Sequence, residues 1–359
     1  QLHRLLHAAQ ARQRSHLNLP RSRGCGRHQN TYHFVELIPE PFSPPSVWLF
    51  RHYTISVLVQ QCPVLWIELC AALLEREFDA KTIRVLLMDT GFKSVFHASA
   101  DLVLGSGANL EYENAKGKMV GERLEAGTQL TVGPDSPYLE FGRMIITPDE
   151  PEAITIRSIE RSQGTPVYSG SLEIKGMPEG LVLVNDLYLE DYLTKVVPSE
   201  MPPSYEKEAL KAQAVCARTY AYRQIQGNTY SQYGAHVDDS TNLQVYNNPS
   251  ADDKSTQAVK ETYGKMLFYE DKPIEAFYFS TSCGRTADAG VWGTDSGKYP
   301  YLRAAEVKEG GKSLGKEDND GFESYIKRED VIAYDTSYPM FRWQTDLPAD
   351  VASAQISGA

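Results

Sequence analysis

The sequence predicts an α+β fold, in which strands and helices are segregated along the chain rather than alternating. From about residue 80 to residue 185, short β-branched runs alternate with glycine-rich turn signals. The clearest helical pattern follows at 204–225, and a shorter helix and a hairpin come after it. We therefore expect a β-rich module at 80–185, packed beside a region of mixed helices and strands that contains a long loop-to-helix element.

Residues 1–79 show neither a helical nor a strand period, and we expect a poorly ordered extension, for which a non-native origin is one interpretation. Its most apolar stretch, 53–74, is about long enough to span a bilayer, and Arg51 precedes it as the positive-inside rule prefers. Pro63 and Glu68 interrupt that stretch. A degraded membrane anchor at 53–74 and a buried amphipathic helix are both left open.

The β-rich module begins with an apolar, β-branched run at 82–88, which predicts a strand. Further strands are expected over 139–147, 154–159 and 171–174, because glycine-containing turn signals separate these runs.

The helix at 204–225 is predicted by an apolar stripe at helical spacing, made of Leu210, Ala214, Ala217, Ala221 and Ile225. Ser204 is a suitable N-cap, and Glu206 and Glu208 would lie in the first turn, where the helix dipole favours acids.

The rest of the chain predicts a second helix at 252–262 and a hairpin formed by 266–269 and 274–280. A last strand-like run at 341–345 is followed closely by the end of the chain. We therefore expect the region 186–359 to be truncated at its C-terminus.

Charge and composition exclude several classes of protein. The net charge is −11, yet residues 1–52 hold seven arginines and only two acids, so the remainder is strongly acidic. An acidic surface repels nucleic acid, which we exclude as a partner. The five cysteines show no paired spacing, so neither a zinc ribbon nor a disulfide scaffold is indicated.

Glu200 lies among apolar residues and three prolines, directly before the long helix. Prolines restrict the backbone, so we expect Glu200 on a stiff loop. Val196, Val197 and Met201 could desolvate its carboxyl, which would raise its pKa and let it act as a general acid near neutral pH. A surface glutamate in a linker is the plainer alternative.

A polar stretch begins at His236 and includes Asp238, which together could bind a metal ion or supply a base. Two ligands are too few for a structural site, so His236 is only a weak metal candidate. Gln244 and Tyr246 alternate with Val245, and on a strand they would face one side. That pattern suits a polyhydroxyl or amide-rich ligand, but equally an ordinary solvated face.

Small hydroxyl residues surround a glycine in a later loop: Ser280, Thr281, Ser282 and Thr286. Such a loop can present hydroxyl and N–H groups to a ligand, or it can simply be a tight turn. Cys283 could be a nucleophile, but only His236 is available in this part of the chain to activate it.

Together these motifs resemble the SpoIID/LytB family, the stage II sporulation protein D family. The resemblance covers 186–303 and rests on four motifs in order, at 189–202, 208–221, 238–246 and 279–286. It implies a lytic transglycosylase that cleaves the bond between N-acetylmuramic acid and N-acetylglucosamine in peptidoglycan strands stripped of stem peptides.

Glu200 matches the family's catalytic glutamate. By resemblance, its acid form protonates the glycosidic oxygen, and the carboxylate then deprotonates the muramic C6 hydroxyl, which closes a 1,6-anhydro ring. This scheme needs one carboxyl group, unlike hydrolysis by two acids. We expect an open groove beside Glu200, lined by Arg218, Tyr220, Gln244, Tyr246, Ser280, Thr281, Ser282 and Thr286.

Some relatives carry Cys/His zinc ligands around 238–246. Asn242 and Leu243 occupy the middle of that stretch here and only His236 remains, so no metal and no other cofactor is expected. A metal-dependent hydrolase that uses His236 and Asp238 is a distant third interpretation.

A non-catalytic module is the main alternative, because LytB-type relatives bind the wall and stimulate a partner amidase. In either case the resemblance places the protein outside the cytoplasmic membrane, in sporulation, engulfment or wall remodelling. Its partners would be glycan strands and other cell-wall hydrolases, with membrane contact only through the anchor at 53–74.

Overall fold

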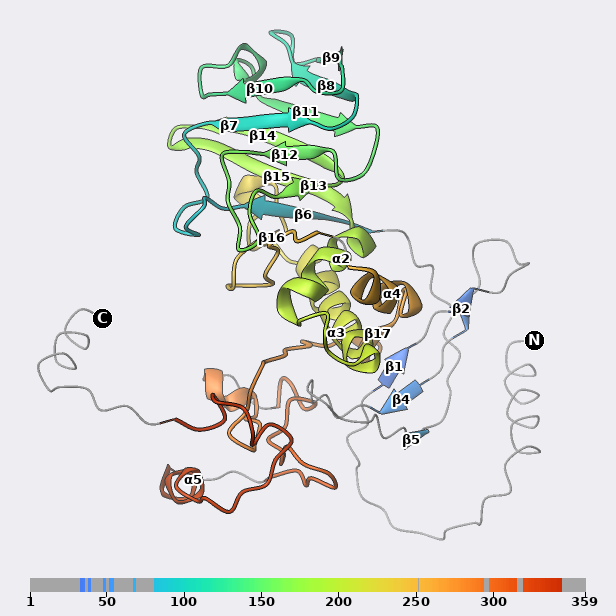
Figure 1. Cartoon of the computed structure of the whole chain (residues 1–359), viewed down its shortest axis with the longest axis vertical. Helices are drawn as coiled ribbons and strands as arrows, with labels where there is room; N and C mark the ends of the chain where they lie inside the picture. Colours follow the sequence, from blue (N-terminus) through green and yellow to red (C-terminus); the bar gives the residue numbers. More distant parts are fainter. Residues whose placement is uncertain are drawn as a thin grey trace, which may run out of the picture. The chain divides into compact units, whose positions relative to one another are not determined.

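The computed structural model describes residues 81–250, 252–293, 297–314 and 319–343, together with five short strands between residues 33 and 68 (Figure 1). The rest of the extension 1–79 and of the anchor candidate 53–74 lies outside the described residues. Within the described ranges, every helix is too short or too polar to cross a bilayer. The chain divides into two compact units, Gln1–Ile55 with Val64–Phe277 and Ser56–Pro63 with Tyr278–Ala359.

The first unit contains a seven-stranded sheet, in the order β16-β6-β15-β14-β11-β8-β9 (Figure 1). Its strands are antiparallel except for β16, which pairs in parallel with β6. Their bounds are β6 Thr82–Leu87, β8 Ala108–Glu113, β9 Met119–Leu124, β11 Arg143–Pro148, β14 Ser171–Met177, β15 Gly180–Tyr188 and β16 Val237–Asp238.

A four-stranded sheet, in the order β10-β7-β12-β13, belongs to the same unit. Its strands are β7 Ala100–Leu104, β10 Gln129–Val132, β12 Ile154–Ile156 and β13 Val167–Tyr168. Burial alternates along β7, as expected for a strand with one face in the core. A 3₁₀ turn, Pro137–Leu139, replaces the start of the strand predicted at 139–147.

The central strand β15 is buried on both faces, because Leu181, Val182, Leu183 and Val184 are all covered. Val182 and Val184 pack with Leu86 and Ala235, so the segment after the long helix covers one side of the sheet. The fold class predicted from the sequence, α+β, is confirmed. The division predicted between 185 and 186 falls inside the first unit and stays a prediction.

Three helices pack together beside the sheet: α2 Leu189–Glu200, α3 Lys207–Ile225 and α4 Asp253–Glu261. The predicted α4 is confirmed, with Asp252 as N-cap accepting a hydrogen bond from Ser255 N–H. The predicted start of α3 at Ser204 is wrong, since Tyr205 N–H closes a turn onto Pro202 O and Glu206 is the N-cap.

A hairpin follows α4 and consists of β17 Met266–Tyr269 and β18 Lys272–Pro273. Glu270 and Asp271 form its turn, both with positive φ, of 47° and 61°. A two-residue turn of this kind matches strand twist. The second strand predicted at 274–280 is wrong, because β18 precedes that range and 274–280 form no strand.

The second unit contains the 3₁₀ turn Ala289–Trp292 and the helix α5 Asn319–Ile326. The strand predicted at 341–345 is absent from its described residues, 341–343.

Gly170, between β13 and β14, has a φ of 75°, and a Cβ there would lie 2.3 Å from Asp186 O and 2.6 Å from Leu187 Cβ. Gly170→Ala should therefore lower the free energy of unfolding by about 2–4 kcal/mol, through backbone strain and overpacking. Denaturant unfolding measures this change. Gly133→Ala is the matched control, because its added Cβ meets nothing within 4 Å; equal losses in both variants would contradict the prediction.

Candidate active site around Glu200

Glu200 is the last residue of α2. The sequence predicted a stiff loop here, and that prediction is wrong: the helix continues through Pro198, which lies in its last turn. A proline there removes one backbone hydrogen bond without preventing the turn. The helix begins directly after β15, with Glu190 and Asp191 in its first turn, where acids are favoured. The sheet and helix together therefore determine where Glu200 lies.

The Glu200 side chain is partly buried, and its Oε1 accepts a hydrogen bond of 2.7 Å from Val245 N–H. Val245 belongs to segment 244–249, which lies outside the regular helices and strands and contacts the end of α2. Asn247 N–H donates to Ser199 Oγ over 3.3 Å, and Lys195 Nζ donates to Pro249 O over 2.9 Å. Three side chains near the end of α2 thus bind backbone groups of segment 244–249.

Gln244 and Tyr246 share one face, as their alternation predicted, but that face is fully buried. Gln244 Nε2 donates to Ala217 O over 3.2 Å, and Tyr246 OH donates to Asn185 Oδ1 over 3.0 Å. The Tyr246 ring lies 5.0 Å from the Tyr192 ring, centroid to centroid. We expected both residues to line an open groove; their burial indicates instead that they fasten segment 244–249 to the core.

Arg218 is also fully buried, at 0% exposure. Its guanidinium forms a bidentate ion pair with Glu190, with distances of 2.7 and 2.8 Å, and donates to Val259 O and Lys265 O. It therefore connects α2, α3 and the end of α4. The expectation that Arg218 lines an open groove is corrected in the same way, and contact of these three side chains with a ligand stays a prediction.

Tyr220, which was also expected to line the groove, is buried. Burial, together with the negative charges of Glu275, Asp238 and Glu200, raises the pKa of Tyr220 to about 12. Tyr220 is therefore a neutral hydrogen-bond donor at physiological pH.

Asp238 is buried and saturated with donors. Ser240 donates to Asp238 Oδ1 through its N–H and its hydroxyl, both over 3.0 Å. Tyr230 OH and Asn242 Nδ2 donate to Oδ2 over 2.5 and 3.3 Å. Burial, followed by this bond to Asp238, raises the pKa of Tyr230 and keeps the phenol protonated. Four donor groups thus hold the Asp238 side chain in place.

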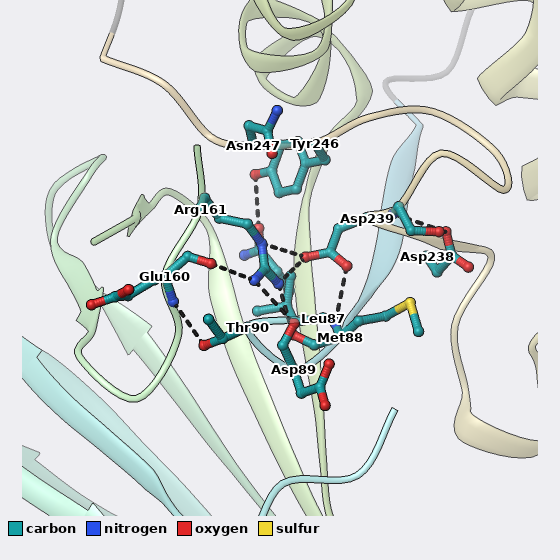
Figure 2. A network of polar contacts seen from close by, with 12 residues as sticks. Leu87, Met88, Asp89, Thr90, Glu160, Arg161, Asp238, Asp239, Tyr246 and Asn247 are labelled. Carbon is teal, nitrogen blue, oxygen red and sulfur yellow. Dashed lines mark hydrogen bonds and ion pairs between the residues drawn. The ribbon is translucent and has the colours of Figure 1, made fainter. Parts of the chain in front are cut away.

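The neighbouring Asp239 forms a buried ion pair with Arg161, whose Nε donates to Asp239 Oδ2 over 3.1 Å (Figure 2). Met88 N–H donates to Asp239 Oδ1 over 3.0 Å, and Arg161 donates to Met88 O over 2.7 Å. Burial raises the pKa of Asp239 to about 6, against the lowering effect of Arg161 and the Met88 N–H. Asp239 O accepts Tyr246 N–H over 3.2 Å, so the network also anchors segment 244–249.

His236 Nδ1 accepts a hydrogen bond of 3.1 Å from Arg84 N–H. Burial, and then the charge of Arg84, lower the pKa of His236, so the ring is neutral with its proton on Nε2. Neither nitrogen presents a lone pair in this state. No cluster of three or more candidate metal ligands occurs within the residues that the structure describes.

Ser280, Thr281, Ser282 and Thr286 belong to the second unit. There Ser282 Oγ accepts Gly284 N–H over 2.9 Å, and Thr286 Oγ1 donates to Arg303 O over 3.1 Å. Gly284 has a φ of 96°, which a tight turn needs and other residues rarely adopt. The tight-turn interpretation therefore explains this loop, and its grouping with Glu200 stays a prediction.

Residues 178–269 match the sequence model of a family described as "Stage II sporulation protein", and this range includes Glu200, Asp238 and segment 244–249. This part of the chain belongs to the SpoIID/LytB family. The family region thus runs from the end of β14 to the end of β17, and the family predicted from the motifs is confirmed.

Curated relatives agree with this family. The chain is 42% identical over 137 residues to the stage II sporulation protein D of Bacillus amyloliquefaciens, and 35% identical over 162 residues to that of Bacillus subtilis. It is 36% identical over 169 residues to the amidase enhancer of Bacillus subtilis. The matches cover 34%, 39% and 46% of this chain and 39%, 47% and 21% of the three relatives, less than half of each.

Proposed function

We propose that this chain carries the catalytic region of a peptidoglycan lytic transglycosylase with a sporulation-related role at the cell wall. Glu200 is the proposed catalytic group, first as general acid and then as base. The observation that carries the proposal is the placement of Glu200: it is partly exposed at the end of a helix, with a backbone N–H bound to one carboxylate oxygen.

The surroundings of Glu200 suit a group that must both donate and accept a proton. The C-terminal end of a helix carries partial negative charge, which favours the neutral acid. The Val245 N–H favours the carboxylate, because it donates to the charged form. These two influences on the Glu200 carboxyl oppose each other.

A single carboxyl group is sufficient for the proposed chemistry. Glu200 would give its proton to the glycosidic oxygen as the bond to muramic C1 breaks. The carboxylate would then take the proton of the muramic C6 hydroxyl as that oxygen bonds to C1. Asp238 is a weaker candidate for a second acid or base, since it is 1% exposed and its oxygens accept hydrogen bonds from Ser240, Tyr230 and Asn242.

A non-catalytic module that stimulates a cell-wall amidase is the second candidate function. The match to an amidase enhancer supports it, over 46% of this chain. The burial of Arg218, Gln244 and Tyr246 supports it as well, because these expected glycan contacts are occupied by protein groups.

Product analysis distinguishes the two candidates. Incubation of peptide-free glycan strands with the full chain should release fragments that end in 1,6-anhydro-muramic acid, which mass spectrometry separates from reducing ends by the mass of one water. Fragments with reducing ends would show that the chain is a hydrolase and not a transglycosylase. Uncut strands, together with faster peptide release from intact peptidoglycan by an added amidase, would support the stimulating module.

A further inference from the structure

The end of α2 holds segment 244–249 through two adjacent side chains. Glu200 Oε1 accepts Val245 N–H and Ser199 Oγ accepts Asn247 N–H. These two N–H groups are two residues apart, and both are bound by the end of α2, whereas the side chains of Gln244 and Tyr246 are buried. Ser199 therefore sets the register in which the segment reaches Glu200.

Ser199 is also bound to the helix backbone in the last turn of α2. Pro198 has no N–H, so the last turn of α2 lacks one backbone hydrogen bond. The Ser199 hydroxyl donates to Lys195 O over 2.6 Å, within that same turn. The Ser199 hydroxyl thus donates to the helix backbone and accepts from the segment that binds Glu200.

We propose that Ser199 is a positioning residue for Glu200: its hydroxyl holds segment 244–249 in the register that brings Val245 N–H onto the carboxylate. The inference rests on the proposed function of Glu200. Loss of the hydroxyl would let the segment shift, and displacements of about 1 Å in an active site can cost about 100-fold in rate.

Two measurements on the full chain test this role, and the first does not depend on activity. In a chain labelled with ¹⁵N-valine, with the Val245 signal assigned by its loss in Val245→Ile, the Val245 amide should shift as the Glu200 carboxyl titrates. Ser199→Ala should reduce that shift at least twofold, and Ser199→Thr, which keeps the hydroxyl, should retain it. An undiminished shift in Ser199→Ala would overturn the inference.

The second measurement is the rate of release of anhydro ends. Ser199→Ala should lower kcat at least tenfold with KM changed less than twofold, and Ser199→Thr should recover most of the rate. Ser255→Ala is the matched control, because Ser255 is equally a helical serine whose hydroxyl donates to a backbone oxygen, Asp252 O. A reduced amide shift with an unchanged kcat would also overturn the inference. A wild-type chain that leaves glycan uncut would overturn the proposed function, while the Val245 comparison would still decide the role of Ser199.

Discussion

Glu200→Gln should reduce the release of anhydro-ended fragments at least about 1,000-fold. General acid–base catalysis contributes about 10²–10⁴-fold, and here one carboxyl is proposed to serve in both proton transfers. Glutamine keeps the shape of the side chain, and its amide oxygen can still accept Val245 N–H, so binding of glycan and the fold should be retained. Single-turnover assays with mass spectrometric detection measure the rate, and thermal unfolding checks the fold.

Glu261→Gln is the control for this substitution. Glu261 is a partly exposed acid in α4, paired with Lys207 and Lys211 at the surface. Its loss should leave the rate within about twofold, because exposed ion pairs contribute at most about 1 kcal/mol. A Glu200→Gln variant that cleaves as fast as the Glu261→Gln variant would transfer the catalytic role to another residue.

Arg161→Met should lower the free energy of unfolding by about 3–5 kcal/mol, since it leaves the Asp239 carboxyl buried without a counter-charge. Denaturant unfolding at pH 7 measures the loss. Arg123→Met is the control, because Arg123 pairs with Asp149 on the surface with about 45% of its side chain exposed, and its loss should cost less than about 1 kcal/mol. Similar losses in the two variants would contradict the structural importance of the buried pair.

The same ion pair predicts a pH dependence. The pKa of Asp239 is raised from 3.8 to about 6 in the folded protein, so the folded state binds this proton more tightly than the unfolded state. The stabilisation that comes from protonating Asp239 is therefore fully present below about pH 4 and is lost as the pH rises through about 6. Without Arg161 the pKa of Asp239 should rise further, so Arg161→Met should be closest to wild type in acid and furthest from it above pH 7. An Arg161→Met deficit that is constant with pH would contradict this account.

The helices were predictable where local signals determine them. Asp252 marks the start of α4 because its side chain caps the helix, and the sequence shows that cap directly. Pro198 misled the prediction of a loop, since a proline in the last helical turn removes only one bond. Strands β7 to β10 were missed because their exposed positions are polar, which weakens a pattern based on apolar runs.

The site was predictable only in part. Glu200 stood out through its neighbours, and the alternation of Gln244 and Tyr246 correctly placed them on one face. Alternation has the same period whether that face meets solvent or the core, so their burial could not be foreseen. The pairing of Arg161 with Asp239 joins residues 78 positions apart, and no local pattern connects them.

The parallel pairing of β16 with β6 limits where the chain can be cut into folded fragments and which residues can change independently in evolution. Val237 and Asp238 complete the edge of a sheet whose other strands come from residues 82–188, and Asp239 takes its counter-ion, Arg161, from the same range. A fragment that begins at residue 186 would keep the family motifs. It would lose β6, which pairs with β16, and Arg161, which pairs with Asp239. Arg161 and Asp239 should therefore be exchanged or lost together among homologues, so the region before the matched segment is a structural co-requisite of it rather than an interchangeable attachment.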